Sequence, residues 1–217
     1  MINQPRLRLL ATLVVISLPG LSFANELDIQ RLAAQYTYYT EDYAPGNFTL
    51  RSKVVGVSVD TLKLIWQKLG VREQRIIVVS WARGYRIVQG TENTVIFSMA
   101  RTQEREEKFK WVGPIYASTH ILIAKSSLAI KAQTLPELFR HRTASLRNDI
   151  AENTLRELGF PSLNLVQVSD LKQAYFMLRS GRVDMMAMTQ YGLTNILKQY
   201  QESADKYQVV LPIIRVE

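Results

Sequence analysis

The chain has 217 residues, of which 47% are hydrophobic and 21% are charged, a composition typical of a globular protein and not of a disordered one. It contains no cysteine and only two histidines, His120 and His141, which excludes disulfides and thiolate metal sites and argues against a zinc site. The net charge is +8, but basic and acidic residues are interleaved without a basic stripe. This pattern argues against a nucleic-acid partner and favours a positive field that attracts an anionic small molecule.

The first 24 residues have the features of a cleavable secretory signal peptide. Arg6 and Arg8 form a basic start, residues 9–18 are apolar, and Ser22-Phe23-Ala24 supplies the small-x-small cleavage pattern. The apolar run is shorter than the about 20 residues needed to cross a membrane. We therefore expect cleavage after Ala24, export, and a mature chain of 217 − 24 = 193 residues with a net charge of 8 − 2 = +6.

Apolar segments of strand type alternate with amphipathic segments of helix type along the rest of the chain. The predicted strands lie at 31–39, 75–80, 94–100, 118–126, 143–147, 165–169, 182–189 and 207–214. The predicted helices lie at 61–70, 81–89, 134–141, 150–160, 170–181 and 191–203. A capping box of Thr134 and Glu137 marks one helix start, and Gly70 and Gly181 mark helix ends. This alternation predicts an α/β protein with mostly parallel sheets.

The stretch "RTQEREEKFKWVGPIY", residues 101–116, combines a dense charge run with an aromatic Gly-Pro segment. Taken alone, such a run favours a solvated helix face, because most charge runs are solvent-exposed. The alternative is that one of its arginines is held out to bind a ligand. Residues 112–118, "VGPIYAS", are the best candidate for a crossing between domains.

Four stretches together resemble one known family. They are "YTEDYAPGNF", "VVGVSVDTLKLIWQKLG", "RTQEREEKFKWVGPIY" with its T-x-x-R pattern, and "DLKQAYFMLRSGRVDMMAM" with its A-x-x-x-L-x-x-G-x-x-D pattern. In this order and spacing, behind a signal peptide, they are similar to the bacterial extracellular solute-binding proteins of family 3. The resemblance runs from about Tyr36 to the end of the sequence.

The resemblance implies an α/β, two-lobed periplasmic-binding-protein fold of type II, with the ligand in the cleft between the lobes. It places the signal peptide at 1–24, lobe one at 25–113, lobe two at 117–208, and the hinge near 112–118 and 209–214. Family members return to lobe one after the second crossover, whereas this sequence stops at "VVLPIIRVE". The C-terminal return is therefore expected to be missing, through truncation, a shortened variant, or completion of the lobe by a partner.

The resemblance also implies a set of ligand-binding residues. Arg105 matches the family arginine that holds the ligand carboxylate, which suits a planar guanidinium. Trp81, Tyr43 and Tyr38 occupy loop ends where the family has aromatic residues, with plain strand packing as the alternative for Tyr38. The remaining candidates are Ser98, which offers a hydroxyl, and Arg101, which is either a second anion contact or an exposed residue.

Two positions depart from the family pattern. Thr189 stands where amino-acid binders have an acid for the α-ammonium, so a standard α-amino acid is disfavoured unless Glu41 or Asp42 replaces that acid. Asp149 opens a helix whose backbone touches the carboxylate in the family. If Asp149 is itself the helix cap, that anion-binding role is in doubt.

The function implied is that of a monomeric periplasmic solute-binding protein. It captures a small polar, carboxylate-bearing, amino-acid-like ligand for a membrane importer of the ABC type, without metal, cofactor or nucleic acid. One alternative is an enzyme on the same fold, although no catalytic triad, nucleophile elbow or metal set is present in the sequence. The other is a sensory or degenerate module that binds a partner protein.

Overall fold

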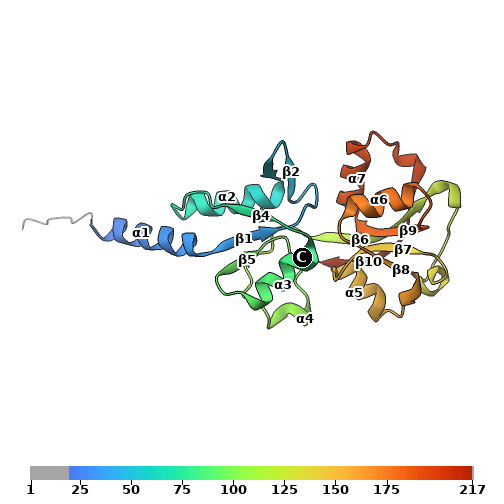
Figure 1. Cartoon of the computed structure of the whole chain (residues 1–217), viewed down its shortest axis with the longest axis horizontal. Coiled ribbons are helices and arrows are strands. Elements are labelled where there is room, and N and C mark those ends of the chain that lie inside the picture. Colours follow the sequence, from blue (N-terminus) through green and yellow to red (C-terminus); the bar gives the residue numbers. More distant parts are fainter. Residues whose placement is uncertain (1–19, 217) are drawn as a thin grey trace, which may run out of the picture.

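The computed structural model describes residues 20–216, so the first 19 residues of the predicted signal peptide lie outside the described part. The chain forms two halves, each built around its own open sheet, and they lie side by side along the long axis of the molecule (Figure 1). We call the half with the three-stranded sheet lobe one and the half with the five-stranded sheet lobe two. The fold is the two-lobed α/β architecture expected from the sequence.

Lobe one is built on a fully parallel sheet with the strand order β4-β1-β5. Tyr38 in the central strand is paired with Ile76 on one side and Val95 on the other. The strands are β1 (Thr37–Thr40), β4 (Ile76–Val78) and β5 (Thr94–Ile96). Their carboxyl ends lie at one edge of the sheet, and the residues that follow these strands therefore lead toward the same region.

The other elements of lobe one are α1 (Gly20–Gln35), α2 (Val57–Lys68), α3 (Trp81–Gly90), α4 (Gln103–Glu106), and a hairpin of β2 (Phe48–Leu50) and β3 (Lys53–Val55). Gly84 allows α3 to pack closely, because a Cβ there would lie 3.1 Å from Val79 and 3.2 Å from Ile96. The helix predicted at 81–89 is confirmed. The strand predicted at 31–39 is wrong in its first part, since α1 continues to Gln35 and extends outward from lobe one (Figure 1).

Lobe two is built on a mixed sheet with the strand order β10-β6-β9-β7-β8. The strands are β6 (Ser118–Lys125), β7 (Thr143–Leu146), β8 (Leu165–Val168), β9 (Met185–Thr189) and β10 (Tyr207–Val216). β7 is parallel to β8 and β9, but β6 is antiparallel to both β9 and β10. The expectation of mostly parallel sheets therefore holds for lobe one and fails here, because β6 enters from lobe one and runs against the strands that follow it.

Helices cover both faces of the lobe-two sheet. They are α5 (Ile150–Glu157), α6 (Leu171–Arg179) and α7 (Gln190–Gln199), with short 3₁₀ turns η1 (Ser126–Leu128), η2 (Leu135–Leu138), η3 (Ser162–Asn164) and η4 (Ala204–Lys206). The predicted capping box of Thr134 and Glu137 is present, but it begins only a 3₁₀ turn. One core cluster includes residues of α6 and α7, and the second includes Ala151 and Leu155 of α5. Burying both sheet faces stabilises this lobe through the hydrophobic effect.

β6 and β10 lie at the boundary between the lobes. They pair along their whole length, from Tyr207 opposite Lys125 to Val216 opposite Ser118. Figure 1 shows the end of β10 at the junction of the two halves. Within residues 20–216 the lobe-one sheet has three strands, and no helix there combines the length and hydropathy that crossing a membrane requires.

Candidate functional site

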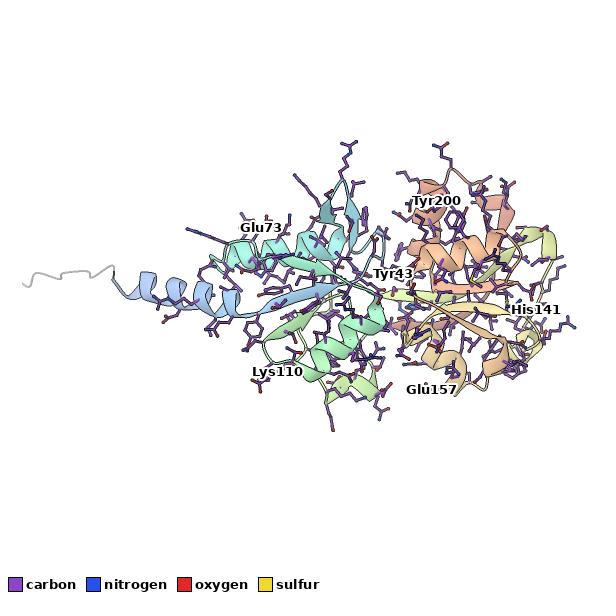
Figure 2. All side chains as sticks on the ribbon, in the orientation of Figure 1. Tyr43, Glu73, Lys110, His141, Glu157 and Tyr200 are labelled. Carbon is purple, nitrogen blue, oxygen red and sulfur yellow. The ribbon has the colours of Figure 1, made fainter. Side chains whose placement is uncertain are left out.

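A tyrosine from lobe one bonds directly to lobe two. The Thr189 backbone N–H donates to the Tyr43 hydroxyl at 2.7 Å, and that hydroxyl donates to Thr189 Oγ1 at 3.1 Å. Tyr43 follows β1, whereas Thr189 ends β9 and caps α7 through a bond from the Gly192 N–H. Figure 2 shows Tyr43 at the junction of the two lobes. A Cβ on Gly192 would lie 3.1 Å from the Tyr43 ring, so glycine permits this close approach.

A tryptophan makes the second bond between the lobes. Trp81, the first residue of α3, is buried and donates its indole N–H to the Asn148 carbonyl at 2.8 Å. Beside this bond lies a cavity of about 110 Å³, lined by Ser80, Trp81, Ala82, Leu146, Arg147, Val168 and Ser169. Its lining comes from both lobes. The two predicted aromatic residues Tyr43 and Trp81 thus lie at the lobe junction, and each holds one lobe against the other.

Arg105 is the largest fully buried side chain in the described part of the chain, with 1% of its surface exposed. Its guanidinium carbon lies 5.1 Å from the ring centroids of both Trp81 and Tyr85, which are one turn apart on α3. Its Nη1 donates to the Ala100 carbonyl at 3.2 Å. Within the described residues no carboxylate forms an ion pair with it. Because a buried cation is costly without a partner, this arginine is a strong candidate to meet a ligand anion.

Two acids, one in each lobe, lie at the ends of elements near the junction. Glu41 directly follows β1, and Asp149 directly precedes α5. The pKa of Glu41 is raised from 4.5 to about 8, mainly by burial and also by the negative charges of Asp149 and Asp42, while Arg105 acts to lower it. Asp149 occupies the N-cap position of α5, but its side chain makes no cap hydrogen bond. Asp149 is therefore the cap of α5 by position, as the sequence indicated, but its carboxylate does not bond to the N–H groups of the helix.

The raised pKa of Glu41 predicts a pH dependence of stability. The folded state binds a proton between about pH 4.5 and 8 that the unfolded state lacks, so stability falls as pH rises through this window. Burial lowers the pKa of His120 from its ordinary value of 6.5. This shift makes stability rise with pH, but only below about pH 6.5. From pH 6.5 to 8 we expect a loss of about 2 kcal/mol in the free energy of unfolding.

Thermal unfolding at closely spaced pH values measures this loss. In Glu41→Gln, which cannot ionise at this position, the melting temperature should change little over the same range. Glu92→Gln removes an exposed carboxylate elsewhere in lobe one and should retain the pH dependence of the unchanged protein. Parallel curves for the unchanged protein and Glu41→Gln would contradict the prediction.

The segment that precedes α5 is held by a buried carboxylate. Glu152 is 1% exposed and accepts a hydrogen bond from the Asn148 backbone N–H at 2.6 Å. It also accepts from Gln167 Nε2 at 2.5 Å and pairs with Arg156 at 2.7 Å. Asn148 is the residue whose carbonyl accepts the Trp81 bond, and it has a positive φ of 57°. Glu152 therefore fixes the backbone that presents both the Trp81 acceptor and Asp149.

Two predicted site residues, Tyr38 and Arg101, make contacts other than those expected, whereas a third, Ser98, has no partner among the described residues. Tyr38 packs edge-on against Trp66 in the lobe-one core, with ring centroids 4.9 Å apart. Its side chain therefore has a packing role in the strand and does not face a ligand. Arg101 is exposed, pairs with Glu106 and lies over the Trp111 ring at 5.7 Å, so a surface ion pair replaces the expected second anion contact. Ser98 has a buried hydroxyl with no hydrogen-bond partner in the described chain.

Several residues at the junction were not singled out from the sequence: Tyr85, His120, Asn148 and Glu152. Tyr85 had a usable signal, since it lies four residues after Trp81 on a predicted helix and so shares its face. Glu152 also had a usable sequence signal, because it is the acid three residues after Asp149. His120 sits in an apolar strand and carried no signal beyond its residue type.

The comparison with protein families identifies the class. The family model described as "Bacterial extracellular solute-binding proteins, family 3" matches residues 37–208, well over half of the chain. The chain therefore belongs to this family, as the sequence motifs indicated. No curated protein sequence matches the chain.

Solved structures agree with this fold. A histidine kinase sensor domain with similarity to periplasmic binding proteins has a TM-score of 0.74 at 18% identity, covering 83% of this chain and 79% of its own. A mutant of the arginine-binding protein ArgBP from T. maritima has a TM-score of 0.73 at 15% identity, covering 88% and 82%. The arginine-, lysine-, histidine-binding protein ArtJ from Geobacillus stearothermophilus has 0.69 at 16% identity, covering 83% and 81%.

Proposed function

We propose that this protein captures a small polar, carboxylate-bearing, amino-acid-like solute between its lobes and delivers it to a membrane importer of the ABC type. The observation that carries the proposal is Arg105, which is buried against two aromatic rings at the lobe junction without an ion pair in the described chain. A guanidinium in this setting suits bidentate binding of a carboxylate. Trp81, Tyr43, Thr189 and Ser98 complete the proposed ligand-binding set.

The proposed mechanism is hinge closure. Lobe one, residues 25–113, and lobe two, residues 117–208, would rotate about the crossover segments near 112–118 and 209–214. Binding energy then offsets the cost of ordering the two lobes. The bonds from Tyr43 to Thr189 and from Trp81 to Asn148 would form on closure. The predicted leader at residues 1–24 would export the chain to the periplasm, where it would act as a monomer.

Ligand sensing is the second candidate function, because one similar structure is a histidine kinase sensor domain. A sensor of this kind would use the same closure to signal to a partner protein instead of releasing its ligand to an importer. Binding measurements do not separate these functions, whereas the identity of the membrane protein that co-purifies with the chain does. A transport complex supports import, and a kinase supports sensing.

A thermal-shift screen of the chain from Asn25 tests the binding function. The screen covers amino acids, dicarboxylates, polyamines and small peptides. A ligand that binds only the folded state stabilises it by mass action and so raises the melting temperature. At a ligand concentration of one hundred times the Kd, the free energy of unfolding increases by about 2.7 kcal/mol. A shift confined to carboxylate-bearing compounds supports the proposal. A cooperative melt that no compound shifts would contradict solute binding.

A further inference from the structure

We propose that Tyr85 is a positioning residue for Arg105. Its ring holds the guanidinium in the orientation that binds a ligand carboxylate, and it does so before the lobes close. This inference rests on the proposed function and adds how the anion-binding group is prepared for its ligand. Tyr85 acts through Arg105, so it sets the preference of the site for a carboxylate without itself bonding to the ligand.

Hydrogen bonding alone does not fix the guanidinium of Arg105. Among the described residues it makes one hydrogen bond, from Nη1 to the Ala100 carbonyl at 3.2 Å, although a guanidinium group carries five N–H donors. A single bond leaves the plane of the group free to turn. Two parallel bonds to a carboxylate require that plane in one orientation. The orientation therefore depends on the surfaces that pack against the guanidinium.

Two aromatic rings of α3 supply those surfaces. The guanidinium carbon of Arg105 lies 5.1 Å from the ring centroids of both Trp81 and Tyr85. The two rings stack on each other, with centroids 5.5 Å apart and an interplanar angle of 29°. A guanidinium is attracted to an aromatic face, most strongly where water is excluded, and Arg105 is only 1% exposed. The rings therefore restrict the guanidinium by both shape and charge.

The two rings differ in what holds them. Trp81 donates its indole N–H to the Asn148 carbonyl of lobe two, a bond that the proposed hinge motion would break on opening. Tyr85 packs between Trp81 and Phe109, whose ring centroid is 5.7 Å away, and all of these partners belong to lobe one. We therefore expect Tyr85 to keep Arg105 oriented in the open state. Such preorganisation lowers the ordering cost of binding a ligand.

The ring of Tyr85, and not its hydroxyl, makes these contacts. The hydroxyl is buried and has no hydrogen-bond partner among the described residues. The contacts with Arg105, Trp81 and Phe109 are all made by the aromatic ring. Tyr85→Phe therefore keeps the positioning surface, whereas Tyr85→Leu keeps an apolar side chain but removes the aromatic face.

Probe pairs that differ only in a carboxylate test the role of Tyr85. The pairs are L-arginine with L-argininamide, L-glutamine with L-glutaminamide, and glutarate with its monoamide. Calorimetry gives the preference for the acid over the amide, using the pair whose acid binds most tightly. Tyr85→Leu should reduce this preference about tenfold, and Tyr85→Phe should restore it. Tyr36→Leu, the same change at an exposed tyrosine of lobe one, should keep the preference within about twofold.

A double-mutant cycle separates positioning from a general loss of stability. In the Arg105→Ala background, Tyr85→Leu should change the affinity for the acid by less than about twofold, because the group that it positions is gone. A residue with only a structural role would weaken the acid and the amide alike, and would do so in both backgrounds. Circular dichroism confirms that each variant is folded. Tyr85→Met, which also removes the ring, replaces Tyr85→Leu if that variant does not fold.

The other outcomes contradict the inference in distinguishable ways. If Tyr85→Leu keeps the preference for the acid, or if Tyr85→Phe loses as much as Tyr85→Leu, the ring does not position Arg105 and solute binding stands. If Arg105→Ala keeps the preference, Arg105 does not bind the carboxylate, and the positioning role fails with it. If neither these probes nor any compound in the thermal-shift screen binds, the proposed function itself fails.

Discussion

Replacing Arg105 by alanine is expected to weaken binding of a carboxylate ligand identified in the screen by about 2–5 kcal/mol, a loss of roughly 30-fold to several thousandfold. The guanidinium is fully buried and already oriented by the rings of Trp81 and Tyr85. A ligand carboxylate at this position would lose its only buried cationic partner among the residues placed at the junction. Calorimetric titration of the folded variant measures the loss directly.

Two further arginine variants make this test specific. Arg105→Lys keeps the charge but loses the planar fork and the stacking on the two rings, so it should recover only part of the affinity. Arg101→Ala removes the neighbouring exposed arginine, whose partner is Glu106, and should leave the affinity unchanged. An unaltered affinity in Arg105→Ala would remove Arg105 from the binding site.

Replacing Glu152 by alanine is expected to lower the free energy of unfolding by about 3–5 kcal/mol. This carboxylate is 1% exposed and has three partners, the Asn148 N–H, the Gln167 amide and the Arg156 guanidinium. Its removal leaves a backbone N–H without its acceptor and opens a cavity at the start of α5. Unfolding in urea, followed by circular dichroism, measures the change in stability.

Glu157 on the same helix is the matched control. It is exposed and lies in the last turn of α5, so Glu157→Ala should change the free energy of unfolding by less than about 0.5 kcal/mol. Glu152→Gln should fall between the two, since the amide keeps the shape and can still accept one of the hydrogen bonds. A loss in Glu152→Ala no larger than that in Glu157→Ala would show that this network contributes little to stability.

Local features of the fold were predictable because they depend on neighbours in sequence. The helix at 81–89 and the strand at 118–126 follow from hydrophobic periodicity, which short segments carry by themselves. The strand predicted at 31–39 was wrong in its first part, since an apolar run of this length fits the end of a helix as well as a strand. The antiparallel direction of β6 could not be predicted, because it depends on the path of the chain between the lobes.

The sequence by itself determined the family and the α/β class, since the motifs and the alternation of elements are local patterns, and the T-x-x-R motif made Arg105 a candidate for ligand binding. Only the tertiary structure separated Arg105, buried at the lobe junction, from Arg101, which forms a surface ion pair four residues earlier. It alone placed Tyr38 in the core and brought Tyr43 of lobe one against Thr189 of lobe two. These outcomes depend on which residues distant in sequence become neighbours, because burial and electrostatic interaction act through space.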